Sequence, residues 1–378
     1  IEDGVEGCDD GNQDHTDGCD RNCAVATSQV AVGYHNKCIL RGGIPYCMGP
    51  NTNGAVGDGT NVDRSSPTRV LNLTGVVQLS GMRESQCALK SNGTVWCWGF
   101  NTQGQLGNNS TDHQNRPGPV SGLTEVVEIA GGHSGICARR DDGTVWCWGS
   151  NANGQGGHGT VGGINRTPVQ TGRISNVVQI SGGHFFCARQ ADGTTWCWGY
   201  GGTGQMGDGV ISSDNRYPGR VSDDAGFVDL QVSNYHACAR KNDRTIWCWG
   251  DNRFGQLGDG TTTHRSTPQQ VSGINDATLV ALPGFNKTCA IRAGDLVWCW
   301  GSNLGGGLGD GSTINRISPV RVAGLGRVRT IAHGATGHSN MALTINNETY
   351  VWGQNYFGSL GLGSGEPQFH NAQRVAGF

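Results

Sequence analysis

The chain has 378 residues, a formal net charge of −3 and a sequence pI of about 6.4. Basic residues are scattered along it, so it lacks the basic footprint that nucleic-acid binding requires. No stretch approaches the ~20 apolar residues that a membrane-spanning helix needs, and we therefore expect neither nucleic acid nor a membrane span. Glycine supplies 65 residues, far above its usual share of about 7%. It recurs periodically, which indicates turns rather than disorder.

Residues 1–27 are predicted to form a separate acidic, disulfide-bonded module. Cys8 is followed by Asp-Asp-Gly-Asn, and an Asp-Gly pair leads into Cys19, with Cys23 close behind. This order resembles the short cysteine-rich repeat of myxobacterial and related surface proteins, which usually has four cysteines; the first is absent here. Because the total number of cysteines is odd, we expect one of the three to pair with another chain or with residues outside this sequence. Truncation, together with loss of a secretion leader, is the simpler alternative.

The same module carries a cluster of oxygen-bearing side chains. Its members are Asp9, Asp10, Asn12, Asp14 and Asp17. Carboxylate and amide oxygens are the ligands that calcium prefers, although the spacing differs from the twelve-residue helix–loop–helix calcium loop. Calcium is therefore the one cofactor that we consider for this chain, and acidic turns that are merely solvated are the alternative.

From residue 28 onward, the spacing Gly-x-Asn-x2-Gly-x2-Gly returns seven times, every 50 to 52 residues. Only the fourth copy lacks the asparagine, which is replaced by Gly201. A fixed period of this length indicates copies of one supersecondary unit, stacked or arranged in a ring. The first glycines of the seven copies are Gly49, Gly99, Gly149, Gly199, Gly250, Gly301 and Gly353.

Each unit is predicted to contain strands and turns. A Val/Ile run such as residues 126–131 comes first, and two short apolar runs around Asn92-Gly93 then indicate a hairpin, because these residues accept the positive φ of tight turns. A loop rich in glycine, asparagine and threonine follows, and then a short run such as residues 319–322. No segment has a convincing helical period. The chain is therefore predicted to be all-β.

Seven such units in residues 28–378 predict a seven-bladed β-propeller with four-stranded blades. The chain stops where other units continue into their Val/Ile strand, and residues 29–35 look like that missing strand. We therefore expect the N-terminal strand to complete the last blade, which would remove the open edges of an unclosed array.

The motif Trp-Gly-x-Asn-x2-Gly-Gln-Leu-Gly, at residues 98–107 and 249–258, resembles the repeat of the regulator of chromosome condensation family. The resemblance covers residues 28–378 and implies a seven-bladed propeller of four-stranded blades. It does not imply one activity, since family members include a nucleotide exchange factor, a plant ultraviolet photoreceptor and a secreted β-lactamase inhibitor. The photoreceptor's Gly-Trp-Arg-His-Thr motif is missing from this chain.

Six units carry a cysteine pair that straddles the hairpin turn. In such a hairpin the two cysteines fall opposite each other, within the separation that a cross-strand disulfide tolerates. The rival interpretation, thiolate metal sites, needs a histidine or a third cysteine that recurs at a fixed geometry beside each pair, and neither does. Disulfides persist outside the reducing cytosol, so the chain is predicted to be extracellular or exposed on the cell surface. The pairs are Cys38 with Cys47, Cys87 with Cys97, Cys137 with Cys147, Cys187 with Cys197, Cys238 with Cys248, and Cys289 with Cys299, while Met341 and Val351 hold these places in the seventh unit.

Other recurring side chains are interpreted as structural. The paired tryptophans, such as Trp96 and Trp98, alternate with a cysteine and are expected to pack between blades. The arginine that precedes a proline in four units is expected to tie a loop. A histidine before the hairpin strand in five units is interpreted as a packing and hydrogen-bonding residue. These two sets are Arg166, Arg216, Arg265 and Arg316, and His35, His133, His184, His236 and His338.

No catalytic motif is present, and we predict a non-enzymatic protein with no catalytic residue. Two functions remain. In the first, the propeller is a rigid structural or adhesive unit of an extracellular, possibly filamentous, assembly and binds protein partners or copies of itself. In the second, it is a secreted binder or enzyme inhibitor that acts through loops on one propeller face. The loops that depart most from the repeat, residues 112–115, 161–164, 210–215 and 365–371, are the expected contact sites.

Overall fold

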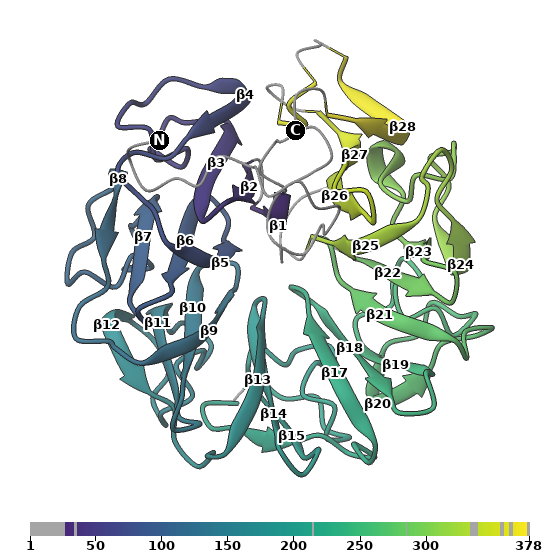
Figure 1. Cartoon of the computed structure of the whole chain (residues 1–378). Helices are drawn as coiled ribbons and strands as arrows, with labels where there is room; N and C mark the ends of the chain where they lie inside the picture. The colour runs from purple at the N-terminus through teal and green to yellow at the C-terminus, as the bar shows by residue number, and fades with distance from the viewer. Residues whose placement is uncertain are drawn as a thin grey trace, which may run out of the picture.

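The structure is a computed structural model that describes residues 27–33, 36–213, 215–284, 286–332, 339–355, 359–362 and 366–375. Within them, seven four-stranded antiparallel sheets surround a central axis as the blades of a propeller (Figure 1). The predicted fold is therefore confirmed. Residues 1–26 of the predicted N-terminal module lie outside the described residues, with Cys8, Cys19, Cys23 and the candidate calcium ligands, while Thr27 begins the first strand of the propeller.

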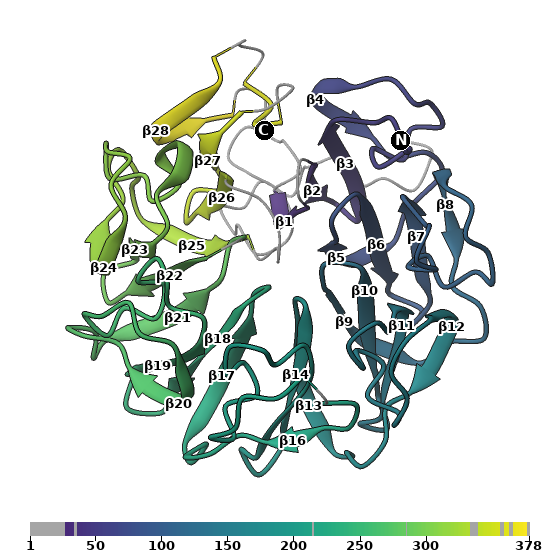
Figure 2. The ribbon, with the colours of Figure 1, turned by 180° about the vertical axis from the view of Figure 1, so that it is seen from behind.

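Each blade uses four consecutive strands, and the first of them lies innermost (Figures 1 and 2). The first strands are β1 (Thr27–Val32), β5 (Val76–Gly81), β9 (Val126–Gly131), β13 (Val177–Gly182), β17 (Phe227–Val232), β21 (Ala277–Ala281) and β25 (Val328–Ile331). The second strands are β2 (Lys37–Arg41), β6 (Ser85–Lys90), β10 (Gly135–Arg140), β14 (Phe185–Gln190), β18 (His236–Lys241), β22 (Lys287–Arg292) and β26 (Ser339–Thr344).

The third and fourth strands complete the sheets outward. The third strands are β3 (Ile44–Gly49), β7 (Val95–Gly99), β11 (Val145–Ser150), β15 (Thr195–Gly199), β19 (Ile246–Gly250), β23 (Leu296–Gly301) and β27 (Thr349–Gln354). The fourth strands are β4 (Arg64–Arg69), β8 (Gln114–Pro119), β12 (Ile164–Gln170), β16 (Gly219–Arg220), β20 (Arg265–Gln270), β24 (Arg316–Arg321) and β28 (Gln368–Arg374). The short 3-10 helix η1 (Leu304–Gly306) precedes β24. No helix of the described residues has both the length and the apolar character needed to cross a bilayer.

The hairpins form where the turn residues predict them. In blade 3, the carboxylate of Asp142 accepts a hydrogen bond from the backbone N–H of Thr144 at 2.9 Å, and Gly143 takes a φ of +75°. Glycine accepts this conformation without the clash that a Cβ would cause. Blade 5 has Arg244 at this position, with a φ of +66°. Local turn chemistry therefore sets the register that places the cysteines of β10 and β11 opposite each other.

The ring closes between blades 1 and 7, which lie side by side in both views (Figures 1 and 2). One expected detail is wrong: the N-terminal strand does not complete the last blade. Strand β1 pairs with β2 as the inner strand of blade 1, and blade 7 has its own four strands, β25 to β28. The two blades meet instead through a buried apolar cluster that includes Val30 and Ile39 of blade 1 and Met341 and Val351 of blade 7. Side-chain packing, not strand exchange, holds the closure.

The hydrophobic core is divided among the interfaces between neighbouring blades. Trp98, fully buried, packs with cysteines and valines of blade 1, and Trp96 lies against the same cluster. Cys97, between them in the strand, belongs to the cluster shared with blade 3. This arrangement confirms the predicted alternation, because successive side chains of a strand point to opposite faces. Both faces of each sheet are therefore buried against a neighbour.

The glycines of the repeat make room for the next blade. Gly107 has a φ of +65°, and a Cβ there would lie 2.7 Å from Nε1 of Trp148 in the following blade. The same indole donates a hydrogen bond to the backbone oxygen of Gln105 at 3.0 Å. A side chain at position 107 would displace the tryptophan, which explains why this glycine and tryptophan recur together. In blade 1, Met48 stands in the tryptophan's place, against Gly361.

The asparagine of the repeat holds the long loop between the third and fourth strands. In blade 5, Oδ1 of buried Asn252 accepts a hydrogen bond from the N–H of Leu257 at 2.9 Å, and its Nδ2 donates to the carbonyl of Thr261 at 3.1 Å. One side chain thereby satisfies backbone groups that would otherwise be buried without partners. The equivalent pair of bonds is made by Asn51, Asn101, Asn151 and Asn303.

Blade 4, the exception, satisfies its loop differently. Gly201 replaces the asparagine, and the side chain of Asn215 fills the space that a Cβ at Gly201 would need. Asn215 Nδ2 donates to the carbonyls of Ser212 at 2.7 Å and Gly199 at 3.3 Å. In blade 4 the side-chain amide that holds the loop therefore comes from the C-terminal end of the loop rather than from its start.

The arginine that precedes the outer strand also acts on this loop. Arg265 and Arg316 form ion pairs of 2.8 Å with Asp259 and Asp310, whose side chains are nearly buried. Arg64, which was not singled out from the sequence, pairs with Asp58 at 2.6 Å in the same way. The loop-tying role therefore holds in blades 1, 5 and 6.

The structure joins all six cysteine pairs as the sequence predicts. Each bond links the second and third strands of one blade, with Cα atoms 4.0 to 4.1 Å apart. In blade 7, Met341 faces Val351 in the same register. Blade 7 is thus the blade without a covalent link, and it lies at the closure of the ring. The bonds of blades 1 to 6, in order, join Cys38 to Cys47, Cys87 to Cys97, Cys137 to Cys147, Cys187 to Cys197, Cys238 to Cys248, and Cys289 to Cys299.

Candidate interaction surface

One face of the propeller carries two kinds of loop from each blade. The turn between the first and second strands and the long loop after the third strand lie next to each other, as the 2.8 Å hydrogen bond from Ser150 N to the carbonyl of Ser134 shows in blade 3. The face therefore combines turns near the axis with the variable loops of the rim. Loops positioned by a rigid scaffold are common binding elements.

A row of ring-bearing side chains crosses three of these turns. His133, His184 and Tyr235 are spaced 51 residues apart and come from blades 3, 4 and 5. The rings of His133 and His184 stack with centroids 4.2 Å apart, and those of His184 and Tyr235 with centroids 5.1 Å apart. Tyr200 lies edge-on to both His184 and Tyr235, at 6.3 Å from each. We call these four residues the ring row.

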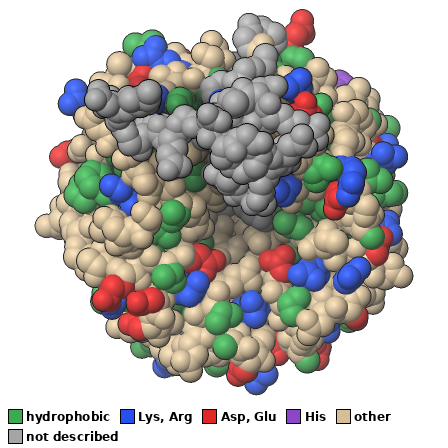
Figure 3. Space-filling model, in the orientation of Figure 1, with side chains coloured by type: hydrophobic (Ala, Val, Ile, Leu, Met, Phe, Trp, Pro, Cys, Tyr) green, Lys and Arg blue, Asp and Glu red, His purple; other side chains and the backbone are tan. Residues whose placement is uncertain are grey.

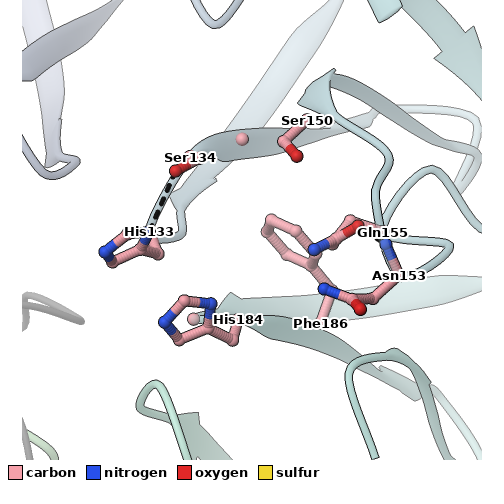
Figure 4. Close-up of a pocket in the computed structure, with 9 residues that line it drawn as sticks. His133, Ser134, Ser150, Asn153, Gln155, His184 and Phe186 are labelled. Carbon is pink, nitrogen blue, oxygen red and sulfur yellow. Dashed lines mark hydrogen bonds between the residues drawn. The ribbon is translucent and has the colours of Figure 1, made fainter. Parts of the chain in front are cut away.

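A cavity opens beside the ring row, between blades 3 and 4 (Figure 4). Its volume is about 170 Å³. In the close-up, Ser150 lies at the end of β11, Asn153 and Gln155 come from the long loop that follows it in blade 3, and His184 and Phe186 approach from blade 4. The lining residues are His133, Ser134, Gly135, Ser150, Asn153, Gln155, Gly183, His184 and Phe186.

The size and lining of the cavity indicate what it can accept. Small-molecule sites usually enclose ~300–1,000 Å³, so this cavity is small for a metabolite or cofactor. It is large enough for one inserted side chain, with Phe186 as an apolar base and amides and hydroxyls at its rim. Hot spots of protein interfaces have this form: an anchor residue enters a pocket that is bordered by aromatic side chains.

The imidazoles of the ring row are uncharged at neutral pH. Burial, with the nearby charge of Arg83, lowers the pKa of His133 from its usual 6.5 to about 4. Burial, with the charge of His133, lowers the pKa of His184 to about 3. Burial likewise raises the pKa of Tyr235 above its usual range, and Tyr200 adds to this effect. The row is thus a neutral aromatic surface that carries polar atoms, which suits contact with a protein.

Ser134 and His133 form the one contact of this site that resembles catalytic machinery. The hydroxyl of Ser134 and Nδ1 of His133 are 2.9 Å apart. A nucleophile–base pair also needs a third group to orient the base, and no described residue makes a hydrogen bond to Nε2 of His133. The described residues also contain no group of three or more His, Cys, Asp or Glu that could hold a metal ion.

The recurring histidines divide into two classes. His236 is fully buried, with Nδ1 2.7 Å from the hydroxyl of Ser233 and Nε2 2.8 Å from that of Thr288 in the next blade. The hydrogen-bonding role expected from the sequence holds for this residue. His133 and His184 instead line the cavity, and Tyr235, one residue before His236, takes the place of His184 in blade 5. In the sequence, the constant spacing of 51 residues between His133, His184 and Tyr235 was the feature that could have indicated the row. His35 and His338 lie outside the described residues.

The loops that depart from the repeat expose apolar side chains on the rim. Val161 is 44% exposed in blade 3, and Val210 and Ile211 are 56% and 62% exposed in blade 4. Within residues 112–115, His113 makes a contact inside its own loop: its Nδ1 accepts a hydrogen bond from the N–H of Asn101 at 3.0 Å. The face in Figure 3 shows hydrophobic side chains dispersed among polar ones, with charges of both signs around a central depression. On that face, the described apolar side chains form no single large patch (Figure 3).

Comparison with known proteins agrees with the fold. Residues 45–376 match the RCC1-like domain family. The ultraviolet-B receptor UVR8 of Arabidopsis thaliana is 33% identical over 134 residues, which are 35% of this chain and 30% of UVR8. The E3 ubiquitin-protein ligase HERC2 of Homo sapiens is 32% identical over 121 residues, 32% of this chain and 2% of HERC2. These matches cover less than a third of the relatives' lengths.

Two solved structures show the same architecture. Yeast RCC1 (Prp20), bound to Kap60, superposes with a TM-score of 0.78 at 20% identity, over 87% of this chain and 83% of that chain. The ectodomain of the receptor kinase ACR4 from Arabidopsis thaliana superposes with a TM-score of 0.52 at 18% identity, over 87% of this chain and 97% of that one. Together with the repeats and the seven blades, the family match shows that the chain belongs to the RCC1-like domain family.

Proposed function

We propose that this protein is a non-enzymatic interaction scaffold that works outside the cytosol and binds protein through the ring row and its cavity. The carrying observation is the stack of His133, His184 and Tyr235 beside a cavity that fits one side chain. Aromatic residues at the centre of a contact surface supply a large share of binding energy. The rigid ring beneath them keeps the entropy cost of binding small.

The six disulfides support the proposed location. All twelve cysteines of these bonds are at most 2% exposed, and the bonds recur in six of the seven blades. A set of this kind forms and persists in an oxidising compartment. Each closed loop of about ten residues contributes roughly 2.5–3 kcal/mol in the chain-entropy model. Such reinforcement suits a protein that works without the protection of the cytosol.

The relatives make protein binding the natural activity to test. Yeast RCC1 (Prp20) has been solved bound to Kap60, and a second structure of Prp20p was described together with its binding properties to Gsp1p and histones. For the present chain, we propose partners in an extracellular assembly, either copies of itself or other proteins. The alternative is a secreted binder that blocks its partner through the same face, and the exposed rim residues such as Ile211 favour neither role over the other.

Sedimentation velocity of the full chain over a wide concentration range, with non-reducing gels, separates the two roles. A scaffold of an assembly should form oligomers, or bind a co-purifying component of the assembly, whereas a blocker should remain monomeric and bind a separate target. In either role, the double substitution His184→Ala and Tyr235→Ala should weaken binding at least tenfold, about 1.4 kcal/mol or more. Thermal unfolding of the variant checks that the propeller is intact.

Phe100→Ala is the matched control. Phe100 holds the same repeat position in blade 2 as Tyr200 in blade 4, but its ring stacks on His113 of its own loop, 4.8 Å away. This control should leave binding unchanged. A variant at His184 and Tyr235 that binds as tightly as the natural protein would show that the ring row is not the contact surface. A natural protein with twelve free thiols would contradict the proposed location.

A further inference from the structure

Two lysines of this chain are buried, which is unusual for a residue that is almost always exposed. The chain has four lysines in all. Lys37, at the start of β2 in blade 1, is 0% exposed, and Lys287, at the start of β22 in blade 6, is 1% exposed. Blade 7 lies between these two blades at the closure of the ring (Figure 1).

Both lysines point toward blade 7. Lys37 lies on the same side of β2 as Ile39, because alternate residues of a strand share a face, and Ile39 packs in the buried cluster shared with blade 7. Lys287 lies on the same side of β22 as Cys289, which packs with Ala342 of blade 7. The two ammonium groups are close enough that the charge of Lys37 lowers the pKa of Lys287.

Neither ammonium group has a partner among the described residues. Nζ of Lys37 and Nζ of Lys287 are both buried without a hydrogen bond. Asn340, the second residue of β26 in blade 7, donates from Nδ2 to the carbonyl of Gly307 in blade 6, while its Oδ1 is also left without a partner. No described carboxylate acts on either lysine: burial alone lowers the pKa of Lys37 to about 7, and burial with the like charge lowers that of Lys287 to about 7.

Two like charges that are buried together without a counter-charge are strongly unfavourable. A bound anion would remove the repulsion and supply hydrogen-bond acceptors to both ammonium groups. Lysine is also an adaptable ligand for anions, because its three donors rotate about a flexible stem. We call the boundary of blades 6, 7 and 1 the seam. A bound anion would add most stability there, because blade 7 lacks a disulfide.

We propose that Lys37 and Lys287 form a binding site for a carboxylate anion at the seam of blades 6, 7 and 1. This inference does not depend on the proposed function. The carboxylate has two possible sources: a free carboxylate ion, or the acidic residues of this chain's own first 26 positions, which include a single arginine. These acidic residues are Glu2, Asp3, Glu6, Asp9, Asp10, Asp14, Asp17 and Asp20.

The test measures thermal unfolding of the full chain in citrate against sodium chloride of equal ionic strength. Four proteins are compared: the natural chain, a chain in which all eight acidic residues are replaced by their amides, the double variant Lys37→Met and Lys287→Met, and the control variant Lys90→Met and Lys241→Met. The control removes the two half-buried lysines that lie outside the seam. At a hundredfold excess over Kd, a bound anion should raise the Tm by about 3–6 °C.

If the site takes a free carboxylate, citrate should raise the Tm of the natural chain and of the control but not that of Lys37→Met with Lys287→Met. If the chain supplies its own carboxylate, citrate should leave the natural chain unchanged and raise the Tm of the amide variant. No response in either the natural chain or the amide variant would overturn the proposal. An equal response in the double variant at Lys37 and Lys287 would overturn it as well.

A second measurement covers the case in which the double variant does not fold. NMR of the full chain with isotope-labelled lysine should show four side-chain signals. Citrate should move the two signals of Lys37 and Lys287 in the natural chain or in the amide variant, while those of Lys90 and Lys241 stay in place. Signals that stay in place in both proteins would overturn the proposal.

Discussion

The indole Nε1 of Trp98 donates a hydrogen bond to the backbone oxygen of Ala55, 3.0 Å away, across the boundary between blades 1 and 2. The loop that supplies this oxygen also contains Gly57, where a Cβ would lie 2.6 Å from the same Nε1. Two recurring features of the sequence, the glycine and the tryptophan, are therefore two sides of one contact. The glycine and the tryptophan recur together because each blade must leave space for the tryptophan of the next blade and accept its hydrogen bond.

Gly57→Ala tests this contact. The substitution adds a Cβ against Trp98 and also places an alanine at a φ of +76°. The positive φ costs about 1–2 kcal/mol, and the overlap adds roughly 1–3 kcal/mol. We expect the free energy of unfolding to fall by about 2–5 kcal/mol, the sum of these two costs, as measured by chemical denaturation with the disulfides intact.

Gly260→Ala is the control for that experiment. Its φ is +81°, but no heavy atom lies within 4 Å of the position that a Cβ would occupy. It should therefore show the cost of the positive φ alone, about 1–2 kcal/mol. Equal losses in the two variants would mean that the contact with Trp98 contributes nothing.

Asn252→Ala removes the side chain that holds the long loop of blade 5. It leaves the N–H of Leu257 and the carbonyl of Thr261 without their partner, and unsatisfied buried groups cost about 1–3 kcal/mol each. We expect the unfolding free energy to fall by roughly 2–6 kcal/mol, the sum for the two groups. In blade 4, Asn215→Ala should have a similar effect, because the side-chain amide of Asn215 donates hydrogen bonds to the carbonyls of the corresponding loop. Asn61→Ala, at an exposed position, should change stability by less than about 0.5 kcal/mol.

Met341→Cys with Val351→Cys should give blade 7 the disulfide that it lacks. The two positions are paired in the same register as the cysteines of the other blades, for example Cys289 with Cys299. Closing this loop should stabilise the protein by up to about 3 kcal/mol in the chain-entropy model, less the packing lost from the Met341 side chain. Comparing the Tm of the oxidised and reduced double variant isolates the bond. A lower Tm in the oxidised form would show that blade 7 departs from the geometry of its neighbours.

Acid should destabilise the protein through its buried histidines. Burial lowers the pKa of His236 to about 3 in the folded chain, while the unfolded chain keeps a value of about 6.5. Between these two values the unfolded state binds a proton that the native state does not, so stability falls as the pH falls below 6.5. The titration of His236 should account for about 2 kcal/mol of the unfolding free energy that is lost between pH 6.5 and pH 5.

The variant His236→Gln measures this share. The glutamine does not titrate, so the loss of unfolding free energy between pH 6.5 and pH 5 should be about 2 kcal/mol smaller than in the natural protein. His133 and His184 act in the same direction, with smaller effects because they are partly exposed. Identical pH profiles for the variant and the natural protein would show that the pKa of His236 is the same in the folded and the unfolded chain.

The sequence alone was enough to predict the seven blades, the hairpins and the partners of the twelve paired cysteines. These features are local and periodic: a turn such as Asp142-Gly143 sets the register of its own hairpin, so that Cys137 faces Cys147, and the period repeats the result. The prediction that the N-terminal strand completes the last blade was wrong. A blade that has all four of its own strands and a blade that lacks one strand can show the same sequence pattern at the last residues, so the pattern does not distinguish them. Only the pairing of β1 with β2 separates the two.

Contacts between blades were decided by the tertiary structure. Tyr235 and His236 are neighbours in the chain, yet one joins the ring row on the surface and the other is buried between blades 5 and 6, because successive residues of an extended chain point to opposite sides. Lys37 and Lys287 are 250 positions apart and hold different places in the repeat, so no period relates them. They face the same seam because a closed ring brings its first and sixth blades to either side of the seventh. A linear pattern specifies each blade, but closure alone determines which blades share a neighbour.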